Sequence, residues 1–326
     1  MRAALRYSPD ITVINLDKLT YAARPGNLSD VAQENKGTRY HFVEGDICDA
    51  ALVASVLSGY RPSVVDRPIL PDWIVNFAAE SHVDRSIEDS TAFVRSNVMG
   101  VHVLLEAART QGIGTTRGGF LQISTDEVYG ALGDDGYFTE DSLVQPNSPY
   151  AATKAAAEHL VRSYHKTYGM RVLTVRSANN YGPDQFPEKV IPVMMAKASS
   201  NQRLPVYGDG RNVREWLYVE DNCAGILHVL MNGQSGETYN IGGTTEMRNI
   251  DLAKMILQKL DKPESLIEMV PDRPGHDWRY AMKSDKVRAL GWEPKVSFEE
   301  GLDRTIASYA GSGRMQDAAV KGSDIK

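Results

Sequence analysis

Short apolar runs alternate with longer amphipathic stretches through the first half of the chain. The apolar runs have the length of buried strands and occupy residues 11–16, 40–43, 73–79, 120–123 and 172–175. Helix-like stretches lie between some of them, at residues 50–59, 91–110 and 150–168. Strands that alternate with helices predict parallel βαβ units. The expected fold class is therefore α/β, with a Rossmann-like doubly wound parallel sheet.

Beyond residue 185 the pattern is less regular. Short strands are expected at residues 204–207, 216–219 and 237–241, with helices near 221–231 and 250–260. This pattern predicts a smaller, interleaved α/β substrate-binding lobe over residues 186–314, some of whose segments return to the first domain, residues 1–185. Residues 315–326 are polar and are expected to form a fraying tail.

Composition narrows the class of protein. The net charge of −6 argues against broad affinity for nucleic acid or for a membrane surface. No apolar run reaches the ~20 residues of a membrane span, and residues 1–10 contain no secretory signal. Cys48 and Cys223 offer neither a disulfide framework nor zinc spacing. A cytoplasmic protein without a metal site is the expectation.

Polar or small residues follow the predicted strands at several points. Ligand sites in doubly wound sheets collect at the carboxyl ends of the strands. The residues expected at this edge are Asp17, Asp46, Ala78, Ala79, the segment 124–127, Asn179 and Asn180.

Asp17 is the first candidate for cofactor binding. A strand that ends in Asp17, followed by Lys18, fits a carboxylate that accepts both ribose hydroxyls of a dinucleotide and repels a 2′-phosphate, so NAD is favoured over NADP. The glycine fingerprint lies ~20 residues before this acid, which runs off the start of the chain. The chain as given is therefore expected to lack the phosphate loop and the first strand, with residues 1–7 ending the first helix. A turn or cap is the alternative reading of Asp17.

Two further segments fit a cofactor site and also have simpler readings. Asp46 could bind the cofactor or cap the helix that follows it. Ala78 and Ala79 are small and follow a buried strand, so a flat ring or a pyrophosphate could approach their backbone. Packing alone is the alternative for them.

Tyr150 and Lys154 lie four residues apart and therefore on one face of a helix, which Pro149 is suited to begin. The ammonium group can lower the pKa of the phenol from its usual ~10 toward neutrality and can hold a cofactor ribose.

Thr125, Asp126 and Glu127 supply a hydroxyl and two carboxyl groups just upstream. Neighbours in a regular strand point to opposite faces, so the strand must end and turn here if both acids serve one pocket. Gly130 and the loop 131–136 favour such a turn. A solvated acidic turn is the alternative. The proximity of Tyr150 favours an enzyme that moves protons and hydride on a sugar.

These segments resemble the dTDP-glucose 4,6-dehydratases, a family of extended short-chain dehydrogenase/reductases. The resemblance is carried by STDEVYG, SPYAATK, SANNYGPDQFPEKVIP, NLDKLTYA, FAAESHVDRS, YGDGRNVREWLYVED, GETYNIGG and DRPGHDWRY, in order over nearly the whole chain. The related 4-epimerases lack the Asp126–Glu127 pair, and residues 272–276 are more similar to the thymidine-nucleotide enzymes than to the plant UDP-glucose dehydratases. The chain departs from the family in lacking a GGAGFIG-type loop and in a longer segment at residues 63–72.

The resemblance implies conversion of dTDP-D-glucose to dTDP-4-dehydro-6-deoxy-D-glucose. Tyr150 would remove the proton of the 4-hydroxyl while C4 passes a hydride to NAD, with Thr125 hydrogen-bonded to the same oxygen. Lys154 would lower the pKa of Tyr150 and position the nicotinamide ribose. Glu127 would take the C5 proton and Asp126 would protonate the departing 6-hydroxyl, before hydride returns to C6. Close like charges and burial can keep one acid protonated and the other ionised.

The resemblance also implies binding residues and a partner. Cofactor contacts are expected from Asp17, Lys18, Leu19, Thr20, Asp46, Ile47, Phe77, Ala78, Ala79, Ser81, Ser96, Tyr150, Lys154 and Asn180. Substrate contacts are expected from Ser81, Thr125, Asn179, Glu188, Lys189, Tyr207, Arg214, Asn240, Arg273 and His276. Arg214 and Arg273 provide fixed positive charge for a diphosphate. The family pairs two long helices into a four-helix bundle, so a homodimer through residues 91–110 and 150–168 is expected.

Two alternatives stay open at this point. One is a UDP-glucose 4,6-dehydratase or another nucleotide-sugar epimerase or dehydratase, which a product assay across dTDP-, UDP- and CDP-glucose would identify. The other is a non-catalytic nucleotide-sugar-binding protein or an inactive truncated fragment. The missing loop supports the second, because its backbone N–H groups and helix N-terminus would seat the pyrophosphate. Titration with NAD would test it.

Overall fold

The computed structural model describes residues 1–35, 37–62, 68–272 and 274–310. Within these ranges the chain forms two compact units. Unit 1 contains residues 1–128, 144–176 and 226–239, and unit 2 contains residues 129–143, 177–225 and the chain from 240 onward. The chain thus passes between the units several times, and each unit is described by itself.

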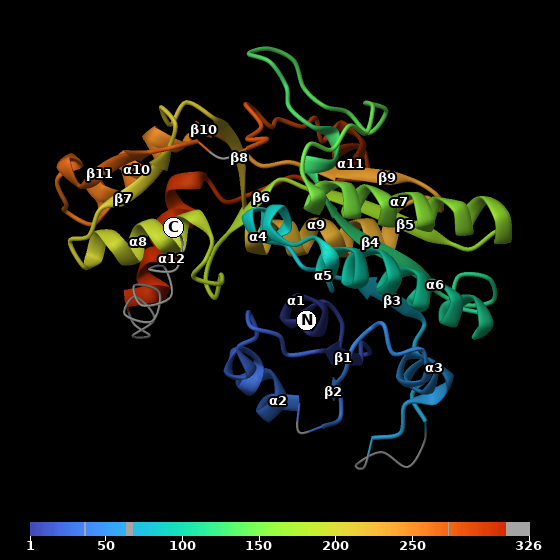
Figure 1. Cartoon of the computed structure of the whole chain (residues 1–326). Coiled ribbons are helices and arrows are strands. Elements are labelled where there is room, and N and C mark those ends of the chain that lie inside the picture. The colour runs from blue at the N-terminus through green and yellow to red at the C-terminus, as the bar shows by residue number, and fades with distance from the viewer. Residues whose placement is uncertain (36, 63–67, 273, 311–326) are drawn as a thin grey trace. The chain divides into compact units, whose positions relative to one another are not determined.

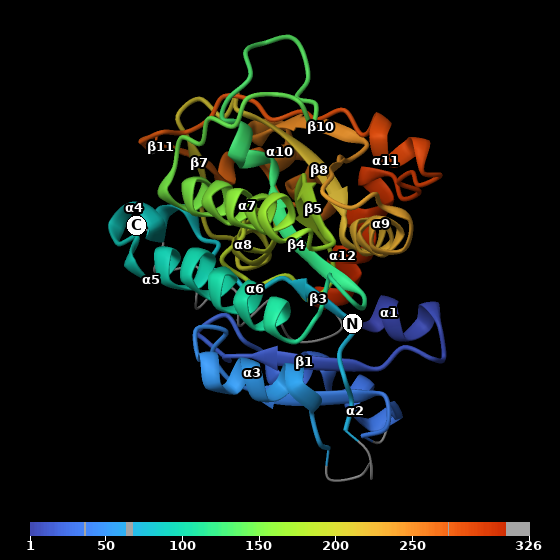
Figure 2. The same ribbon diagram turned by 90° about the vertical axis from the view of Figure 1, so that its right-hand side faces the viewer.

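Parallel strands build the centre of unit 1. β1 (Val13–Asp17) pairs in parallel with β2 (Tyr40–Glu44), with Val13 opposite Tyr40 (Figure 2). A second sheet has the strand order β3 (Trp73–Asn76), β4 (Gly119–Thr125), β5 (Val172–Ser177) and β9 (Thr238–Ile241), and β3 is parallel to β4. No strand pairing joins β1 to β3 within the described ranges. The expected α/β class with parallel sheets is confirmed.

Helices cover these strands. They are α1 (Arg2–Tyr7), α2 (Ser29–Asn35), α3 (Ala50–Gly59), α4 (Val83–Glu88), α5 (Thr91–Phe93), α6 (Gly100–Thr110) and α7 (Pro149–Tyr168), with a 3-10 turn at Pro25–Leu28. α7 packs on β4 and on α6 (Figure 1). Phe120 of β4, Leu105 of α6 and Val161 of α7 are buried in their shared core. This packing fixes which face of α7 turns toward the end of β4.

The helix expected over residues 91–110 is confirmed, and it is not α-helical throughout. A π-helical segment, Val94–Met99, separates α5 from α6. A π-helix carries one more residue per hydrogen-bonded turn than an α-helix and often marks a functional position. The apolar periodicity did not show it, because one inserted residue hardly changes the pattern of a long helix.

Unit 2 contains a three-stranded sheet of order β10 (Thr245–Arg248), β8 (Val213–Tyr218) and β6 (Asn179–Tyr181), and a parallel pair of β7 (Leu204–Tyr207) with β11 (Ile267–Val270). Its helices are α8 (Val190–Ser199), α10 (Asn249–Lys259), α11 (Asp285–Ala289) and α12 (Phe298–Ala310), with a 3-10 turn at Glu264–Leu266. α9 (Val219–Asn232) begins in unit 2 and ends in unit 1. The buried Tyr181, Trp216 and Leu252 belong to the core of unit 2.

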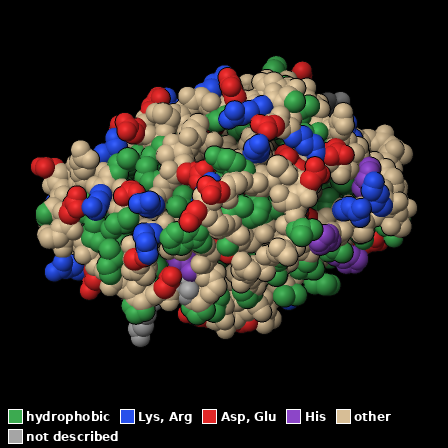
Figure 3. Space-filling view, turned by 90° about the horizontal axis from the view of Figure 1, so that it is seen from above, with side chains coloured by type: hydrophobic (Ala, Val, Ile, Leu, Met, Phe, Trp, Pro, Cys, Tyr) green, Lys and Arg blue, Asp and Glu red, His purple; other side chains and the backbone are tan. Residues whose placement is uncertain are grey.

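The surface mixes both signs of charge. On the face drawn in Figure 3, Lys and Arg side chains are interspersed with Asp and Glu. That face therefore offers no broad basic surface of the kind that nucleic acid attracts. None of the helices in the described part of the chain is long and apolar enough to cross a lipid bilayer.

Candidate active site

The end of β4 brings a hydroxyl and two carboxyl groups together. Thr125 is the last residue of β4, and a 3-10 turn follows at Asp126–Tyr129. Gly130 has a φ of 82°, a left-handed conformation that glycine adopts without strain. The expected end of the strand is thereby confirmed. The turn frees Asp126 and Glu127 from strict strand alternation.

Asp126 is not part of a solvated turn. Its exposed fraction is 2%, and its Oδ1 accepts a hydrogen bond of 3.1 Å from the Thr125 hydroxyl. The backbone N–H of Glu127 donates to the same hydroxyl oxygen at 3.3 Å, while the Glu127 side chain is half-buried. The two neighbouring acids therefore occupy different environments: Asp126 is buried, and Glu127 is partly exposed to solvent.

Local signals begin α7 one residue before Tyr150. Pro149 is its first residue, and the Ser148 hydroxyl caps the helix by accepting the N–H of Ala151 at 3.1 Å. Tyr150 is buried, its ring lies edge-on to Phe93, and its N–H donates to Ser86 of α4. The predicted helix start and the shared face of Tyr150 and Lys154 are confirmed. We call Thr125, Asp126, Glu127, Tyr150 and Lys154 the catalytic cluster, after the role that the sequence predicts for them.

The surroundings of Tyr150 oppose its ionisation. Burial, and then the charges of Glu127 and Asp126, raise the pKa of Tyr150 well above its ordinary value, and a hydrogen bond with Thr125 lowers it only in part. The expectation that Lys154 brings this pKa toward neutrality is wrong for these protein groups. The phenol is desolvated, and negative charge on the neighbouring acids disfavours a phenolate beside them.

Lys154 is buried beneath the same site. Its Nζ donates to the carbonyl oxygen of Ile123 on β4 at 2.5 Å. Burial lowers the pKa of Lys154 to about 8, and the nearby Glu158 acts in the opposite direction. Most Lys154 side chains therefore keep their charge at pH 7.

Asn97 belongs to the site but was not predicted. It lies in the π-helical segment with 1% of its surface exposed. Its Oδ1 accepts the N–H of Glu80 at 2.9 Å, and its Nδ2 donates to the Glu80 carbonyl at 3.0 Å and to Thr153 Oγ1 at 2.9 Å. Asn97 thus ties the loop after β3 to α7. A single Asn in an amphipathic stretch carries no such signal in the sequence.

The predicted ribose-binding acids lie at the ends of β1 and β2. Asp17 is exposed, and its Oδ1 accepts the N–H of Leu19 at 2.8 Å. Asp46 Oδ2 forms ion pairs with Lys18 at 2.9 Å and with Arg95 at 3.6 Å. The reading of Asp46 as a helix cap is wrong.

The cap of α3 is Asp49 instead. Its Oδ1 accepts the N–H groups of Ala51 and Leu52, each at 3.0 Å. Asp46 Oδ1 accepts the N–H of Cys48, which only tightens the preceding turn. Both Asp46 and Asp49 are suited to capping, and only the backbone path decides which one reaches the first turn.

The remaining cofactor candidates of unit 1 flank these acids and β3. Thr20, Phe77 and Ser81 are exposed, Ala78, Ala79 and Ser96 are half-buried, and Ile47 is buried. The N–H of Ala78 donates to Asn76 Oδ1, and Asn76 donates to Gln122 of β4 at 2.9 Å. These hydrogen bonds are internal to unit 1. The groups that could hold the riboses of NAD are the exposed carboxylate of Asp17 and the ammonium of Lys154, as the sequence predicts.

Unit 2 holds most of the predicted substrate residues. Tyr207 lies edge-on to His276 with ring centroids 6.0 Å apart, and His276 Nδ1 lies 2.6 Å from Asp272 Oδ1. Arg214 is buried over the ring of Tyr280. Arg273 lies outside the described residues.

The other candidates of unit 2 are spread over several elements. Glu188 and Lys189 lie just before α8, with Lys189 Nζ 4.0 Å from Glu188 Oε1. Asn179 and Asn180 begin β6, where Asn180 donates to the carbonyl of Ala178. Asn240 is fully buried, and its Oδ1 accepts from the hydroxyl of Tyr129 at 2.7 Å. In this arrangement Asn240 serves the packing of unit 2.

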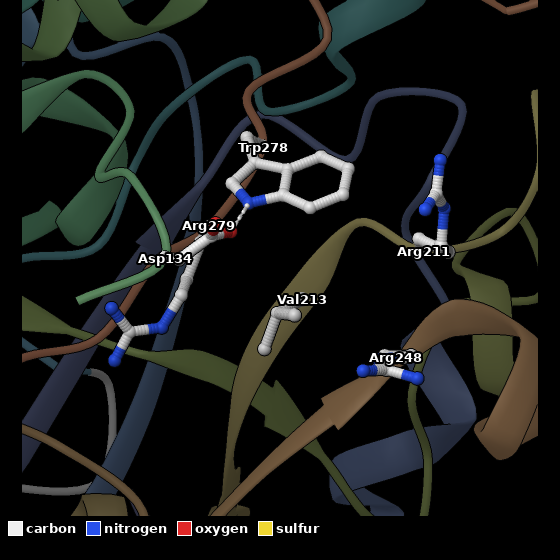
Figure 4. A pocket seen from close by; sticks show the side chains of 6 residues that line it. All are labelled: Asp134, Arg211, Val213, Arg248, Trp278 and Arg279. Carbon is white, nitrogen blue, oxygen red and sulfur yellow. Dashed lines mark hydrogen bonds between the residues drawn. The ribbon is translucent and has the colours of Figure 1, made fainter.

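A hollow of about 430 Å³ lies on unit 2 (Figure 4). It is lined by Asp134, Arg211, Val213, Arg248, Trp278 and Arg279. Asp209 pairs with Arg211 at 2.5 Å and Glu246 pairs with Arg279 at 2.6 Å, so most of its positive charge is compensated. No residue of the catalytic cluster lines it. In the described chain, no group of three or more His, Cys, Asp or Glu side chains could hold a metal ion.

Comparison with known proteins places these features in context. A family model described as GDP-mannose 4,6 dehydratase matches residues 5–305. The dTDP-glucose 4,6-dehydratase of Xanthomonas campestris pv. campestris is 50% identical over 317 residues, covering 93% of this chain and 87% of that protein. The low-salt glycan biosynthesis protein Agl12 of Haloferax volcanii is 48% identical, covering 93% and 91%. The crystal structure of DesIV, a dTDP-glucose 4,6-dehydratase from Streptomyces venezuelae solved with NAD bound, superposes with a TM-score of 0.88 at 44% identity, covering 97% and 93%.

Proposed function

Because this chain belongs to the dTDP-glucose 4,6-dehydratase family of extended short-chain dehydrogenase/reductases, we propose that it converts dTDP-D-glucose to dTDP-4-dehydro-6-deoxy-D-glucose. One observation carries the proposal beyond the likeness. A buried acid, Asp126, and a more exposed acid, Glu127, adjoin Thr125 and the buried Tyr150. An oxidoreductase that only moved hydride would have no use for that acid pair.

The first step is oxidation at C4. Tyr150 removes the proton of the 4-hydroxyl, and Thr125 hydrogen-bonds the same oxygen. Bound NAD would supply the acceptor for the C4 hydride and, once reduced, the donor for C6. Burial, Glu127 and Asp126 raise the pKa of Tyr150. The positive charge of Lys154, four residues along the same helix face, would favour the phenolate as it forms. Asp17 and Lys154 would hold the two riboses of the cofactor.

The second step is loss of water across C5 and C6. The 4-keto group acidifies the C5 hydrogen, which Glu127 removes. Asp126 gives a proton to the departing 6-hydroxyl. Burial favours the uncharged form of a carboxyl group, and Asp126 is the more buried of the two acids. This division of roles follows from their different exposure.

We assign the binding roles by region. Residues 1–185 form the proposed NAD-binding domain and residues 186–314 mainly the nucleotide-sugar lobe, with some segments returning to the first domain. In unit 2, Tyr207, Arg214 and His276 are the proposed nucleotide contacts. The guanidinium of Arg214 suits a diphosphate. The DesIV structure with NAD bound supports the choice of cofactor.

We propose a homodimer in the cytoplasm. α6 and α7 pack side by side, and Met99 and Tyr168 beside them are about half exposed, which would suit a four-helix bundle with a second copy. Both cysteines are free thiols, which suits a reducing compartment. Analytical ultracentrifugation would report the oligomeric state, and a monomer at micromolar concentration would contradict the dimer.

The deciding experiment is a product assay. Purified protein with NAD is offered dTDP-glucose, UDP-glucose and CDP-glucose in parallel, and the 4-keto-6-deoxy product is followed by mass spectrometry and NMR. We expect fastest turnover with dTDP-glucose. If product formed only from UDP-glucose, the protein would be a UDP-glucose 4,6-dehydratase instead. Absence of product and of NAD binding would favour a non-catalytic protein.

A further inference from the structure

The row of buried polar residues on α7 extends beyond the catalytic cluster. Tyr150, Lys154 and Glu158 follow one another at four-residue intervals and so lie along one helix face. Glu158 is 7% exposed, which is unusual for a carboxylate. The chemistry described above does not use it.

Arg176 holds Glu158 from the neighbouring strand. It lies on β5, is 5% exposed, and its Nε lies 3.1 Å from both carboxylate oxygens of Glu158. Its Nη2 donates to Oε2 at 2.5 Å. Such multiple contact between a guanidinium and a carboxylate fixes the orientation of both groups.

Stability alone does not account for this pair. The desolvation of two buried charges often cancels their attraction, so apolar side chains of similar size can be equally stabilising. Glu158 itself has an electrostatic effect on Lys154, one of the candidate catalytic residues. Glu158 is the group that raises the pKa of Lys154 against the effect of burial.

We propose that Glu158, held in place by Arg176, is a positioning residue that keeps Lys154 protonated while Tyr150 removes the substrate proton. The inference rests on the proposed function for the role of Tyr150. Glu158 contacts no reacting atom and acts only through Lys154. The other charged groups near this row are Asp126 and Glu127 at the end of β4, which act on Tyr150. Ile123 contributes a carbonyl to Lys154.

The charge removed by Glu158→Gln sets the direction in which the pKa of Lys154 should move. Glu158→Gln removes a negative charge that favours the ammonium, so the pKa of Lys154 should fall below about 8. The basic side of the pH profile for C4 oxidation should then move to lower pH, by about one pH unit. At pH 8 the kcat/KM for product formation should fall about 5-fold, because the protonated fraction of Lys154 falls from about one half to about one eleventh.

Two further variants separate this role from a structural one. Glu158→Gln leaves Arg176 buried without its partner, and the double variant Glu158→Gln/Arg176→Met removes both charges at once. The double variant should shift the profile less than Glu158→Gln does, because loss of the Arg176 charge acts on Lys154 in the opposite direction. Glu158→Asp keeps the charge and should stay near the wild-type profile. Glu300→Gln, which removes a carboxylate from the ion pair with Arg304 on α12, is the matched control.

The closing measurement titrates Lys154 directly and needs no substrate. Protein labelled with [ε-13C]lysine is followed by NMR against pH, and the Lys154 signal is assigned by its loss in Lys154→Arg. We expect a lower midpoint in Glu158→Gln, a smaller decrease in the double variant, and none of this shift in Glu300→Gln. An unchanged midpoint in folded Glu158→Gln would overturn the proposal. Wild-type protein that makes no product would instead count against the proposed function, while the titration would still decide what Glu158 does to Lys154.

Discussion

Two regions of the molecule bury ionisable side chains that resist ionisation, but with different partners. In unit 1, the catalytic cluster places Tyr150 beside carboxylates that resist its ionisation. In unit 2, Glu215 of β8 is equally buried, but its two oxygens accept the N–H groups of Gly243 at 2.9 Å and Met282 at 3.0 Å. We call these three residues the Glu215 clasp. Burial therefore does not mark a catalytic group by itself.

The difference lies in the partners. Backbone N–H groups of Gly243 and Met282 bind the Glu215 carboxyl group and tie two segments to β8, so we expect the clasp to serve the fold. The catalytic cluster is made of side chains that can each give or take a proton. Groups that influence one another's protonation are typical of active sites. We therefore expect changes in the catalytic cluster to alter the rate of product formation, and changes in the Glu215 clasp to alter the free energy of unfolding.

The largest effect is expected for Tyr150→Phe. Loss of the phenol removes the base for the 4-hydroxyl, so product formation should fall about 10³-fold. The free energy of unfolding should change by less than about 1 kcal/mol, since the ring and its contact with Phe93 remain. Stopped-flow absorbance at 340 nm measures NADH formation on substrate addition. Normal formation would refute the assigned base.

Asp126→Asn should separate the two chemical steps. An amide cannot supply the proton for the 6-hydroxyl, so elimination should slow by about 10²-fold while C4 oxidation slows less. Transient NADH should therefore accumulate. Single-turnover kinetics with dTDP-glucose measure both steps, and dehydration at the wild-type rate would show that another group is the acid.

Glu215→Ala should act on stability instead of chemistry. It leaves the N–H groups of Gly243 and Met282 without their acceptor in a buried site, which costs on the order of 2–4 kcal/mol. Urea denaturation reports this loss, with Glu300→Gln as a surface control expected within about 0.5 kcal/mol of wild type. A change in kcat without a change in unfolding would place Glu215 with the catalytic groups.

The clasp should also make stability depend on pH. Burial raises the pKa of Glu215 from 4.5 to about 7. Its contribution is fully present below about pH 4.5, where folded and unfolded states both hold the proton, and is lost as the pH rises through about 7. The loss should reach up to ~3 kcal/mol. Glu215→Gln does not titrate, so its stability relative to wild type should rise across this window. If the difference in unfolding free energy between Glu215→Gln and wild type stayed constant with pH, the raised pKa of Glu215 would be contradicted.

Several features of the active site could be predicted because they are local. The start of α7 depends on Ser148 and Pro149, and the shared face of Tyr150 and Lys154 depends only on helix geometry. The turn after Thr125 has its own signal in the glycine that follows. Asp46 and Asp49 show the limit of such reasoning, because two acids of equal capping preference stand three residues apart.

The sequence by itself determined the order of the parallel βαβ elements, the family, and the spacing of Thr125, Asp126, Tyr150 and Lys154. Only the tertiary structure decided that Asn97 joins Glu80 to Thr153, that Arg176 holds Glu158, and that the pKa of Tyr150 rises instead of falling. Periodicity and caps arise from interactions within a few residues, which a sequence displays directly. Desolvation and charge pairing depend on how closely distant segments surround a group, and packing alone sets that.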